Sequence, residues 1–271
     1  MAMDYGPPSK ATLSRLRKLQ RKKGRDDLGS FLAEGPKVVA EAFHANLSCR
    51  SLLLAEDFAL PPDVEALLGS GRLPRDRVFT LPSRKFYSLC STQTPQGILA
   101  EFKLPQSAVL TLLGKIGRPV VVLHEVQDPG NVGTAIRCTA ALGGGGVLLT
   151  EGCADLWNPK TVRASAGACF RLPIWTGLSP SGAKAALIKY RDEIWVADAK
   201  GSSVREIEAH SGRLAIVFGN ESRGVGDFYR DAPSARLVGI PMQGGVESLN
   251  VGVAVGIMLT QENSGTDYEL T

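Results

Sequence analysis

The chain has 271 residues, of which 44% are hydrophobic and 21% are charged, and its formal net charge is +4 at pH 7. This balance is typical of a globular protein with one large or two modest domains. No apolar run reaches the roughly 18 residues that a membrane span needs, and the opening MAMDYGPPSK has no apolar segment of a secretion signal. We therefore expect a cytoplasmic protein.

The cysteines and histidines indicate neither a disulfide framework nor a metal site. The five cysteines show no C-x-x-C spacing, and the three histidines, His44, His124 and His210, are scattered. We interpret the cysteines as reduced, mostly buried thiols, and we expect no metal.

A strongly basic segment lies near the amino terminus. Eight residues from Lys10 to Arg25 are Lys or Arg, and none is acidic. Leu13, Leu16 and Leu19 recur at helical spacing, which predicts an amphipathic helix with a cationic outer face. Such a face suits the phosphates of RNA or DNA, although a merely solvated helix surface has the same pattern. The candidate RNA-binding residues are Arg17, Lys18, Lys22 and Lys23.

The first hundred residues alternate short apolar runs with helix-like segments. Strands are expected at 30–35, 51–56, 77–82 and 97–103, and helices at 36–46, 61–71 and 83–89. Prolines and glycines then interrupt this pattern. We place an N-terminal domain at 1–104, a linker at 105–118 and a C-terminal domain at 119–271.

Strands and helices alternate more clearly in the C-terminal domain. The expected strands are 119–126, 146–150, 173–177, 193–199, 213–219 and 236–242, and the expected helices are 131–142, 159–170, 182–190 and a final helix ending at 259. The first strand, PVVVLHEV, is apolar throughout, as in a parallel strand buried on both faces. The pattern predicts an α/β domain with helices on both faces of a mostly parallel sheet. Ligands of such sheets bind in the loops at the carboxyl ends of strands.

Three of these loops carry polar residues suited to a binding site. In HEVQDPGNVGTAIRCTAALG, Asn131 is expected to cap a helix, and Arg137 points away from the apolar face of that helix, beside small residues. In IVFGNESRGV, a glycine ends the strand and Glu221 lies at the site edge. In GIPMQGGVESLNVG, Ser248 is expected to cap the final helix, with Asn250 in its first turn. Free N–H groups there suit anions or ligand acceptors.

The glycines at 143–146 do not form a dinucleotide-binding loop. They close a helix and open a strand, whereas the dinucleotide fingerprint closes a strand and opens a helix. The stretch LHEVQDPGN likewise lacks the glycine-rich loop that a conventional Rossmann methyltransferase carries after its first strand.

The motifs DPGNVGTAIRCTAALG, FGNESRGV and IPMQGGVESLNVGVAVGI together resemble those of the SpoU (TrmH) family of RNA ribose 2′-O-methyltransferases, in the SPOUT superfamily. Their order and separations fit the family, as does NPKTVRASAGACFRLP between the first two. The segment LRKLQRKKGRDDLGSFLAEGPKVVAEA resembles the N-terminal substrate-binding domain of many members that act on ribosomal RNA. The resemblance therefore covers most of the chain.

The resemblance implies a SPOUT domain in which a trefoil knot binds S-adenosylmethionine, plus a small N-terminal α/β RNA-binding domain. The implied cofactor-binding residues are Phe218, Gly219, Asn220, Ile240, Met242 and Leu249. The implied catalytic residues are Arg137, Asn131, Glu221, Ser248 and Asn250. It also implies a homodimer with Arg137 near the interface. The final helix agrees, because it is apolar on nearly every side and must be covered all round, and Gly252 and Gly256 form a strip where another helix can pack.

The implied reaction is methyl transfer to a ribose 2′-hydroxyl, with ribosomal RNA as the expected substrate. Arg137 is either the base or a group that stabilises the developing oxyanion or an adjacent phosphate, since a guanidinium with a pKa above about 12 is a poor base. Transfer RNA is an alternative substrate, and an RNA-binding protein without catalysis is an alternative function. The motifs also occur in resistance methyltransferases, so housekeeping and antibiotic-protection roles both remain open.

Overall fold

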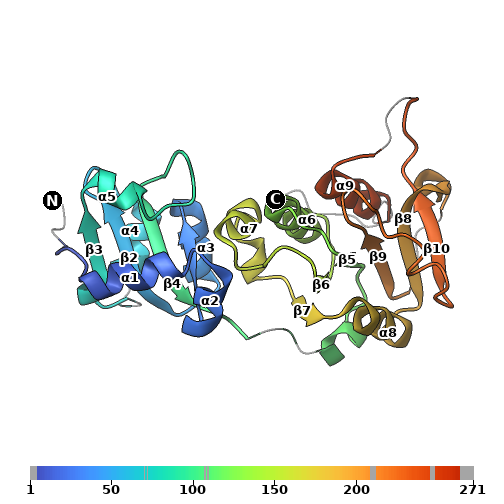
Figure 1. The fold of residues 1–271 in the computed structure, drawn as a ribbon, viewed down its shortest axis with the longest axis horizontal. Helices are drawn as coiled ribbons and strands as arrows, with labels where there is room; N and C mark the ends of the chain where they lie inside the picture. Colours follow the sequence, from blue (N-terminus) through green and yellow to red (C-terminus); the bar gives the residue numbers. More distant parts are fainter. Residues whose placement is uncertain are drawn as a thin grey trace. The chain divides into compact units, whose positions relative to one another are not determined.

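The computed structural model describes residues 5–69, 71, 73–106, 108, 110–207, 212–244 and 248–262. Its residues form two compact units (Figure 1). The N-terminal unit extends to Gln106 and also includes Asp155–Arg171, and the C-terminal unit consists of Ser107–Ala154 and Leu172–Thr271. The linker at 105–118 stays a prediction.

The N-terminal unit is built on a four-stranded mixed sheet. Its strands β1 (Ser30–Glu34), β2 (Cys49–Ala55), β3 (Val78–Leu81) and β4 (Ile98–Lys103) lie in the order β1-β4-β2-β3. Strand β4 is antiparallel to β1 and β2, whereas β2 and β3 are parallel. The helices are α1 (Lys10–Lys18), α2 (Lys22–Leu28), α3 (Pro36–His44), α4 (Pro62–Gly69), α5 (Ser83–Tyr87) and the short 3-10 turn η1 (Arg75–Arg77).

The two faces of this sheet bury different side chains. On one face Leu16 of α1 packs in a leucine-rich cluster with Leu53 and Leu99. On the other face the Phe31 and Phe102 rings stack with centroids 5.9 Å apart, and the Phe43 ring of α3 meets Phe102 edge-on. Strand alternation explains the division, because neighbouring residues point to opposite faces.

The basic segment forms two helices rather than the single amphipathic helix expected from its pattern. Leu16 and Leu19 are buried as predicted, but α1 ends at Lys18 and α2 begins at Lys22. A side chain at Gly24 would place its Cβ 2.0 Å from the Lys18 carbonyl oxygen, so glycine allows the two helices to approach closely.

Arg25, at the end of the same segment, belongs to the interior and not to the cationic face. Its side chain is only 2% exposed. It donates hydrogen bonds to the Leu19 carbonyl oxygen and to the Asp155 carboxylate. The guanidinium therefore ties the segment 155–171 to the N-terminal residues of the unit.

The segment 155–171 also packs on the aromatic face of the sheet. The Trp157 ring lies 4.6 Å from Phe31, centroid to centroid, and Phe170 stacks on Trp157. The single helix expected at 159–170 is wrong. Helix α7 (Pro159–Ala164) and the 3-10 turn η3 (Ala168–Phe170) are separated where Ala166 and Gly167 adopt positive φ, which terminates an α-helix.

The C-terminal unit confirms the predicted α/β domain with a parallel sheet. Its strands are β5 (Val120–Leu123), β6 (Gly146–Thr150), β7 (Ile174–Leu178), β8 (Glu193–Ser203), β9 (Leu214–Phe218) and β10 (Ala235–Gly239), in the order β10-β8-β9-β5-β6-β7. All neighbouring pairs are parallel. The helices are α6 (Pro129–Ala141), α8 (Pro180–Tyr190), α9 (Val251–Glu262) and the 3-10 turns η2 (Leu110–Gly114) and η4 (Val204–Glu206).

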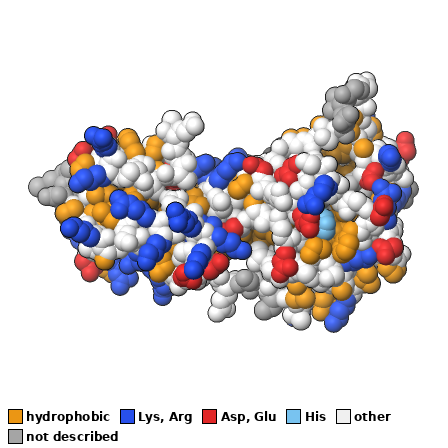
Figure 2. Space-filling model, viewed as in Figure 1, with side chains coloured by type: hydrophobic (Ala, Val, Ile, Leu, Met, Phe, Trp, Pro, Cys, Tyr) orange, Lys and Arg blue, Asp and Glu red, His pale blue; other side chains and the backbone are white. Residues whose placement is uncertain are grey.

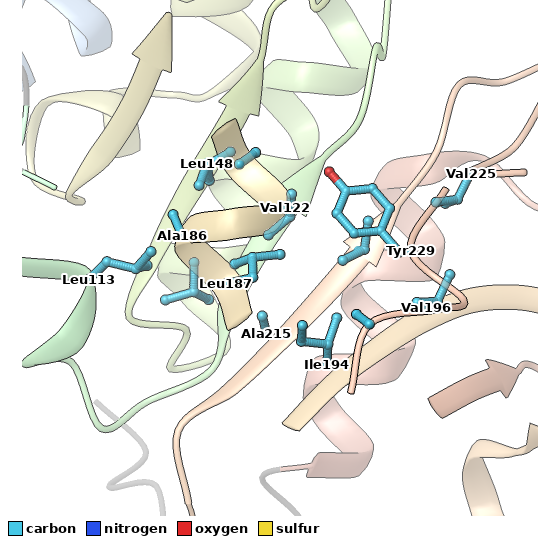
Figure 3. Packing of buried hydrophobic residues seen from close by; sticks show 14 of the residues in the cluster. Leu113, Val122, Leu148, Ala186, Leu187, Ile194, Val196, Ala215, Val225 and Tyr229 are labelled. Atoms are coloured by element: carbon cyan, nitrogen blue, oxygen red, sulfur yellow. The ribbon is translucent and has the colours of Figure 1, made fainter. Parts of the chain in front are cut away.

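One face of the parallel sheet is covered by α8. Figure 3 shows Ala186 and Leu187 of α8 over Val122 and Leu148, with Tyr229 farther along the same cluster. Helix α6 packs on α9 and on β6 instead. The predicted trefoil knot stays a prediction, and Gly245–Glu247, which the third motif contributes to it, lie outside the described residues, as does His210.

Within the described ranges, no helix is long and apolar enough to cross a membrane. The five cysteines are free thiols, with Cys49 and Cys169 buried and the others partly buried. Among the same residues, no group of three or more His, Cys, Asp or Glu side chains is arranged to hold a metal ion.

Candidate cofactor pocket and catalytic cluster

A hollow of about 550 Å³ lies where β9 and β10 end, beside residues 197–199 of β8. Its size falls within the range of small-molecule sites, roughly 300–1,000 Å³. All six predicted cofactor-binding residues line it, namely Phe218, Gly219, Asn220, Ile240, Met242 and Leu249. Val251, Ala254 and Met258 of α9 complete an apolar wall.

Asn220 shapes the loop after β9 rather than serving only as a wall residue. Its backbone exchanges hydrogen bonds with Gly224, and its side-chain oxygen accepts one from the N–H of Arg223. Its amide nitrogen donates to the Glu125 carbonyl oxygen at 3.0 Å, which joins this loop to the one after β5. Gly219 is required there, because a Cβ would lie 2.0 Å from the Gly224 backbone.

Asn131 connects the three loops that the sequence singled out. Its amide nitrogen donates to Glu221 at 2.9 Å, and its oxygen accepts from the Asn250 amide at 2.7 Å. A carboxylate only accepts hydrogen bonds, so the direction of the whole chain of bonds is fixed. The loops after β5, β9 and β10 therefore meet in one polar cluster, Asn131–Glu221–Asn250.

The sequence predicted Asn131 and Ser248 as the caps of the two helices near this cluster, and both predictions are wrong. The cap of α6 is Asp128, whose carboxylate accepts from the Asn131 N–H at 3.0 Å. This leaves the Asn131 side chain available for the cluster. At the start of α9, the side chain of Asn250 accepts from the Gly252 N–H at 2.9 Å, and Ser248 lines the cofactor pocket instead.

Glu221 is held as an anion by its hydrogen bonds. Burial raises the pKa of this carboxyl, but the bonds from Asn131 and from backbone N–H groups outweigh burial, and the pKa lies below its ordinary value. The contributing N–H groups include those of Gln127 and Asp128. A carboxylate so stabilised is a weak proton acceptor at neutral pH and a good positioning group.

Arg137 is exposed on α6, as the helical pattern predicted. Val132, Ile136 and Thr139 on the opposite side of the helix are fully buried. Arg137 makes no ion pair with any described residue, and it is absent from the walls of the cofactor pocket. The small residues beside it are less open than expected, because Thr134 packs against Gly252 of α9.

The described residues leave one side of helix α9 uncovered. Gly252 and Gly256 face α6, where Cβ atoms would meet Thr134 and approach Leu142. The predicted glycine strip therefore serves packing inside this chain. On the uncovered side, Val253 is 50% exposed and Ile257 is 37% exposed, next to Leu249 at 37%.

Sequence reasoning missed three charged residues of the pocket wall, Asp198, Arg223 and Arg230. Asp198 of β8 accepts a hydrogen bond from Arg230 at 2.6 Å, and both line the hollow. The apolar run EIWVA before Asp198 is a signal that could have drawn attention to this carboxylate. No recognisable motif surrounds Arg230.

A six-stranded parallel sheet, with helices on its faces and a small-molecule pocket between the loops after β9 and β10, is the architecture of the SPOUT class of methyltransferases. The chain belongs to the SpoU rRNA Methylase family, whose model matches residues 118–260. Residues 10–100 match the MRM3-like substrate binding domain. The family resemblance inferred from the three motifs is confirmed.

The similarity to known proteins extends over nearly the whole chain. The 23S rRNA (guanosine(2553)-2′-O)-methyltransferase RlmP of Bacillus subtilis is 32% identical, covering 90% of this chain and 92% of its own. The mitochondrial rRNA methyltransferase 3 of Xenopus laevis is 28% identical, covering 88% of this chain and 70% of its own. The AdoMet-bound rRNA methyltransferase of Sinorhizobium meliloti has a TM-score of 0.83 and 26% identity, covering 98% of this chain and 99% of its own.

The protein is therefore a methyltransferase whose cofactor is S-adenosylmethionine, and the pocket fits that molecule. Phe218, Ile240 and Met258 give the hollow an apolar surface of the kind that an adenine ring requires.

Proposed function

We propose that the protein methylates a ribose 2′-hydroxyl of ribosomal RNA. The Asn131–Glu221–Asn250 cluster carries this proposal, because it joins the cofactor pocket to the helix that presents Arg137. The relatives support the substrate class, since the Bacillus protein is named as a 23S rRNA 2′-O-methyltransferase. The N-terminal match to a substrate binding domain also supports it.

Positioning carries most of the catalysis in this proposal. S-adenosylmethionine, when bound, supplies a methyl group already activated by its sulfonium. Transfer to the 2′-oxygen would leave the cofactor as a neutral thioether, and the hydroxyl proton would pass to solvent water. The protein gains rate by aligning the hydroxyl and by stabilising the charge that develops on it.

Arg137 stabilises the developing oxyanion or the phosphate next to the ribose. Its guanidinium is exposed and has no carboxylate partner among the described residues, so its donors are free for RNA. A planar fork of N–H groups suits phosphate and ribose oxygens. Glu221 does not act as the base, because its hydrogen bonds hold its pKa below the ordinary value. Asn131 and Asn250 position the loops, and Ser248 contacts the cofactor.

The basic arm, defined here as Arg17, Lys18, Lys22 and Lys23, binds the RNA backbone. All four side chains are exposed, whereas Arg25 is buried. Figure 2 shows Lys and Arg side chains gathered over α1 and α2 on this face of the N-terminal unit. Such a surface attracts phosphates of any sequence, so the arm supplies affinity and not the choice of nucleotide.

The active form is a cytoplasmic homodimer in which the open side of α9 is covered by a second copy. Val253 and Ile257 expose apolar surface in adjacent turns of a helix that is apolar from Val251 to Leu259. Arg137, Ala140 and Ala141 of the neighbouring α6 are also exposed. A dimer formed through these two helices places Arg137 at the interface.

The proposal is tested by methyl transfer to purified RNAs with isotopically labelled S-adenosylmethionine. We expect label in ribosomal RNA at a ribose that becomes resistant to alkaline cleavage, because a 2′-O-methyl group cannot attack the phosphate. Label in transfer RNA alone would show that transfer RNA, and not ribosomal RNA, is the substrate. Tight RNA binding without label in any RNA would favour the non-catalytic alternative.

A further inference from the structure

A second hollow, of about 520 Å³, lies within the N-terminal unit. Four cationic side chains line it, from Arg15, Arg50, Arg77 and Lys103, together with two hydroxyl groups and the ring of Phe79. These residues come from α1, β2, η1, β3 and β4, so the hollow is assembled from five separate elements. Of its four cations, only Arg15 belongs to the basic segment near the amino terminus.

A buried carboxylate contacts three of the residues that line this hollow. Glu101 of β4 is fully buried and lies directly opposite Ser51 of β2 in the strand register. Arg15 donates to Glu101 through Nε at 3.0 Å, and the Ser51 hydroxyl donates to the same oxygen at 3.2 Å. The Arg50 guanidinium lies 3.8 Å from the other oxygen. Glu101 thereby fixes two guanidinium groups at the mouth of the hollow.

The charges in the hollow do not balance. Four cations face one carboxylate, which leaves a formal excess of three positive charges. Arg77 and Lys103 are exposed and make no ion pair with any residue in the described ranges. The hollow is therefore not a closed ion-pair network in which each cation has its own carboxylate. Converging unpaired cations in a concave site instead concentrate positive potential and attract an anion.

The remaining wall of the hollow suits a nucleoside. Phe79 of β3 is half-buried, so part of its ring is accessible beside the cations. Unpaired bases of RNA stack on such rings, while guanidinium groups hold the flanking phosphate.

We propose that this hollow, lined by Arg50, Arg77, Phe79 and Lys103, binds one phosphate of the substrate RNA and the unpaired nucleoside next to it. The inference rests on the proposed function, since it assumes an RNA substrate. It adds a second RNA contact on the N-terminal unit, distinct in residues from the basic arm. This contact requires an unpaired nucleotide, so it favours loops and bulges over regular duplex.

The test uses single-charge variants of the full chain and a 23S ribosomal RNA transcript. Arg77→Gln and Lys103→Gln each remove one proposed phosphate contact. Because the two cations share one phosphate, the double variant should lower the slope of log affinity against log salt by roughly 0.7–0.9 and weaken binding about five- to eightfold at 0.1 M salt, and each single variant should do so by less. The matched control is Lys37→Gln on α3, an exposed lysine on the helix that packs against the opposite face of the sheet. It should leave the slope unchanged.

Phe79→Leu separates stacking from charge. It keeps an apolar side chain against the leucine-rich cluster but removes the ring. We expect RNA binding to weaken by roughly fivefold to a hundredfold with the salt slope unchanged. Arg77→Lys keeps the charge and should retain the wild-type salt slope. This control shows that the lower slope of Arg77→Gln comes from the lost charge and not from a folding defect. Thermal unfolding and S-adenosylmethionine affinity of each variant should match the wild type.

The outcomes distinguish this site from the proposed function. If Arg77→Gln and Lys103→Gln bind and methylate ribosomal RNA as Lys37→Gln does, the hollow is not an RNA site, although the methyltransferase assignment stands. If Phe79→Leu binds like the wild type while both charge variants are weakened, the nucleoside part of the proposal is overturned. If the wild-type protein neither binds nor methylates ribosomal RNA, the proposed function itself fails.

Discussion

The two units of the molecule hold their functional groups in different ways. In the C-terminal unit, Asn131, Glu221 and Asn250 are fixed by hydrogen bonds to one another at the ends of parallel strands. In the N-terminal unit, Lys18 and Lys22 extend into solvent. Methyl transfer needs an oxygen aligned with a carbon, and only a rigid cluster provides that. Attraction of a phosphate chain needs charge in the right region, and exposed lysines provide that.

The largest expected effect is on RNA binding by the N-terminal unit. Replacing Arg17, Lys18, Lys22 and Lys23 together with Gln should reduce the salt slope by about three and the affinity by about a thousandfold at 0.1 M salt, if each contacts one phosphate. Binding to ribosomal RNA across a salt series measures this, and calorimetry should show unaltered cofactor binding. An unchanged slope would reduce the basic arm to a solvated helix surface.

The second prediction concerns methyl transfer by the C-terminal unit. Arg137→Ala should lower the rate of methyl transfer by roughly a hundredfold to a thousandfold, the usual cost of losing one preorganised donor. Cofactor affinity should stay near wild type, because Arg137 does not line the pocket. Arg137→Lys should restore only part of the rate, since it lacks the planar fork. Lys115→Ala, at an exposed lysine of the same unit, is the control. Near-normal turnover in Arg137→Ala would remove this residue from the mechanism.

The same contrast explains what could be predicted from the sequence. The parallel sheet and the polar loops were predicted because each loop follows its strand in one continuous motif, such as FGNESRGV. The cap assignments failed because Asp, Ser and Asn all cap helices well, and only the fold decides that Asp128 and Asn250 do so here. The cationic hollow could not be predicted, since Arg50, Arg77 and Lys103 are far apart in the chain and meet only across the sheet.

The third prediction concerns the uncovered side of α9. Val253→Glu would bury a charge in the proposed dimer interface, and it should raise the dissociation constant of the dimer at least tenfold, a cost of only about 1.4 kcal/mol. Light scattering across a concentration series measures the change. Ala185→Glu, at an exposed position of α8, introduces the same charge elsewhere and should leave the mass unchanged. A wild-type protein that is monomeric at every concentration would contradict the proposed dimer.

The smallest expected effect is the pH dependence of the Asn131–Glu221–Asn250 cluster. The folded-state pKa of Glu221 lies below its ordinary value of 4.5. Folding therefore favours the ionised form, so Glu221 contributes stability above about pH 4.5 that is lost as the pH falls through the folded-state pKa. The difference in Tm between wild type and Glu221→Gln should be constant near neutral pH and should shrink below about pH 4.5. Thermal unfolding from pH 7 to pH 3 measures it. A difference that instead disappears between pH 6 and 7 would mean that Glu221 titrates near neutrality, and would return it to the list of candidate bases.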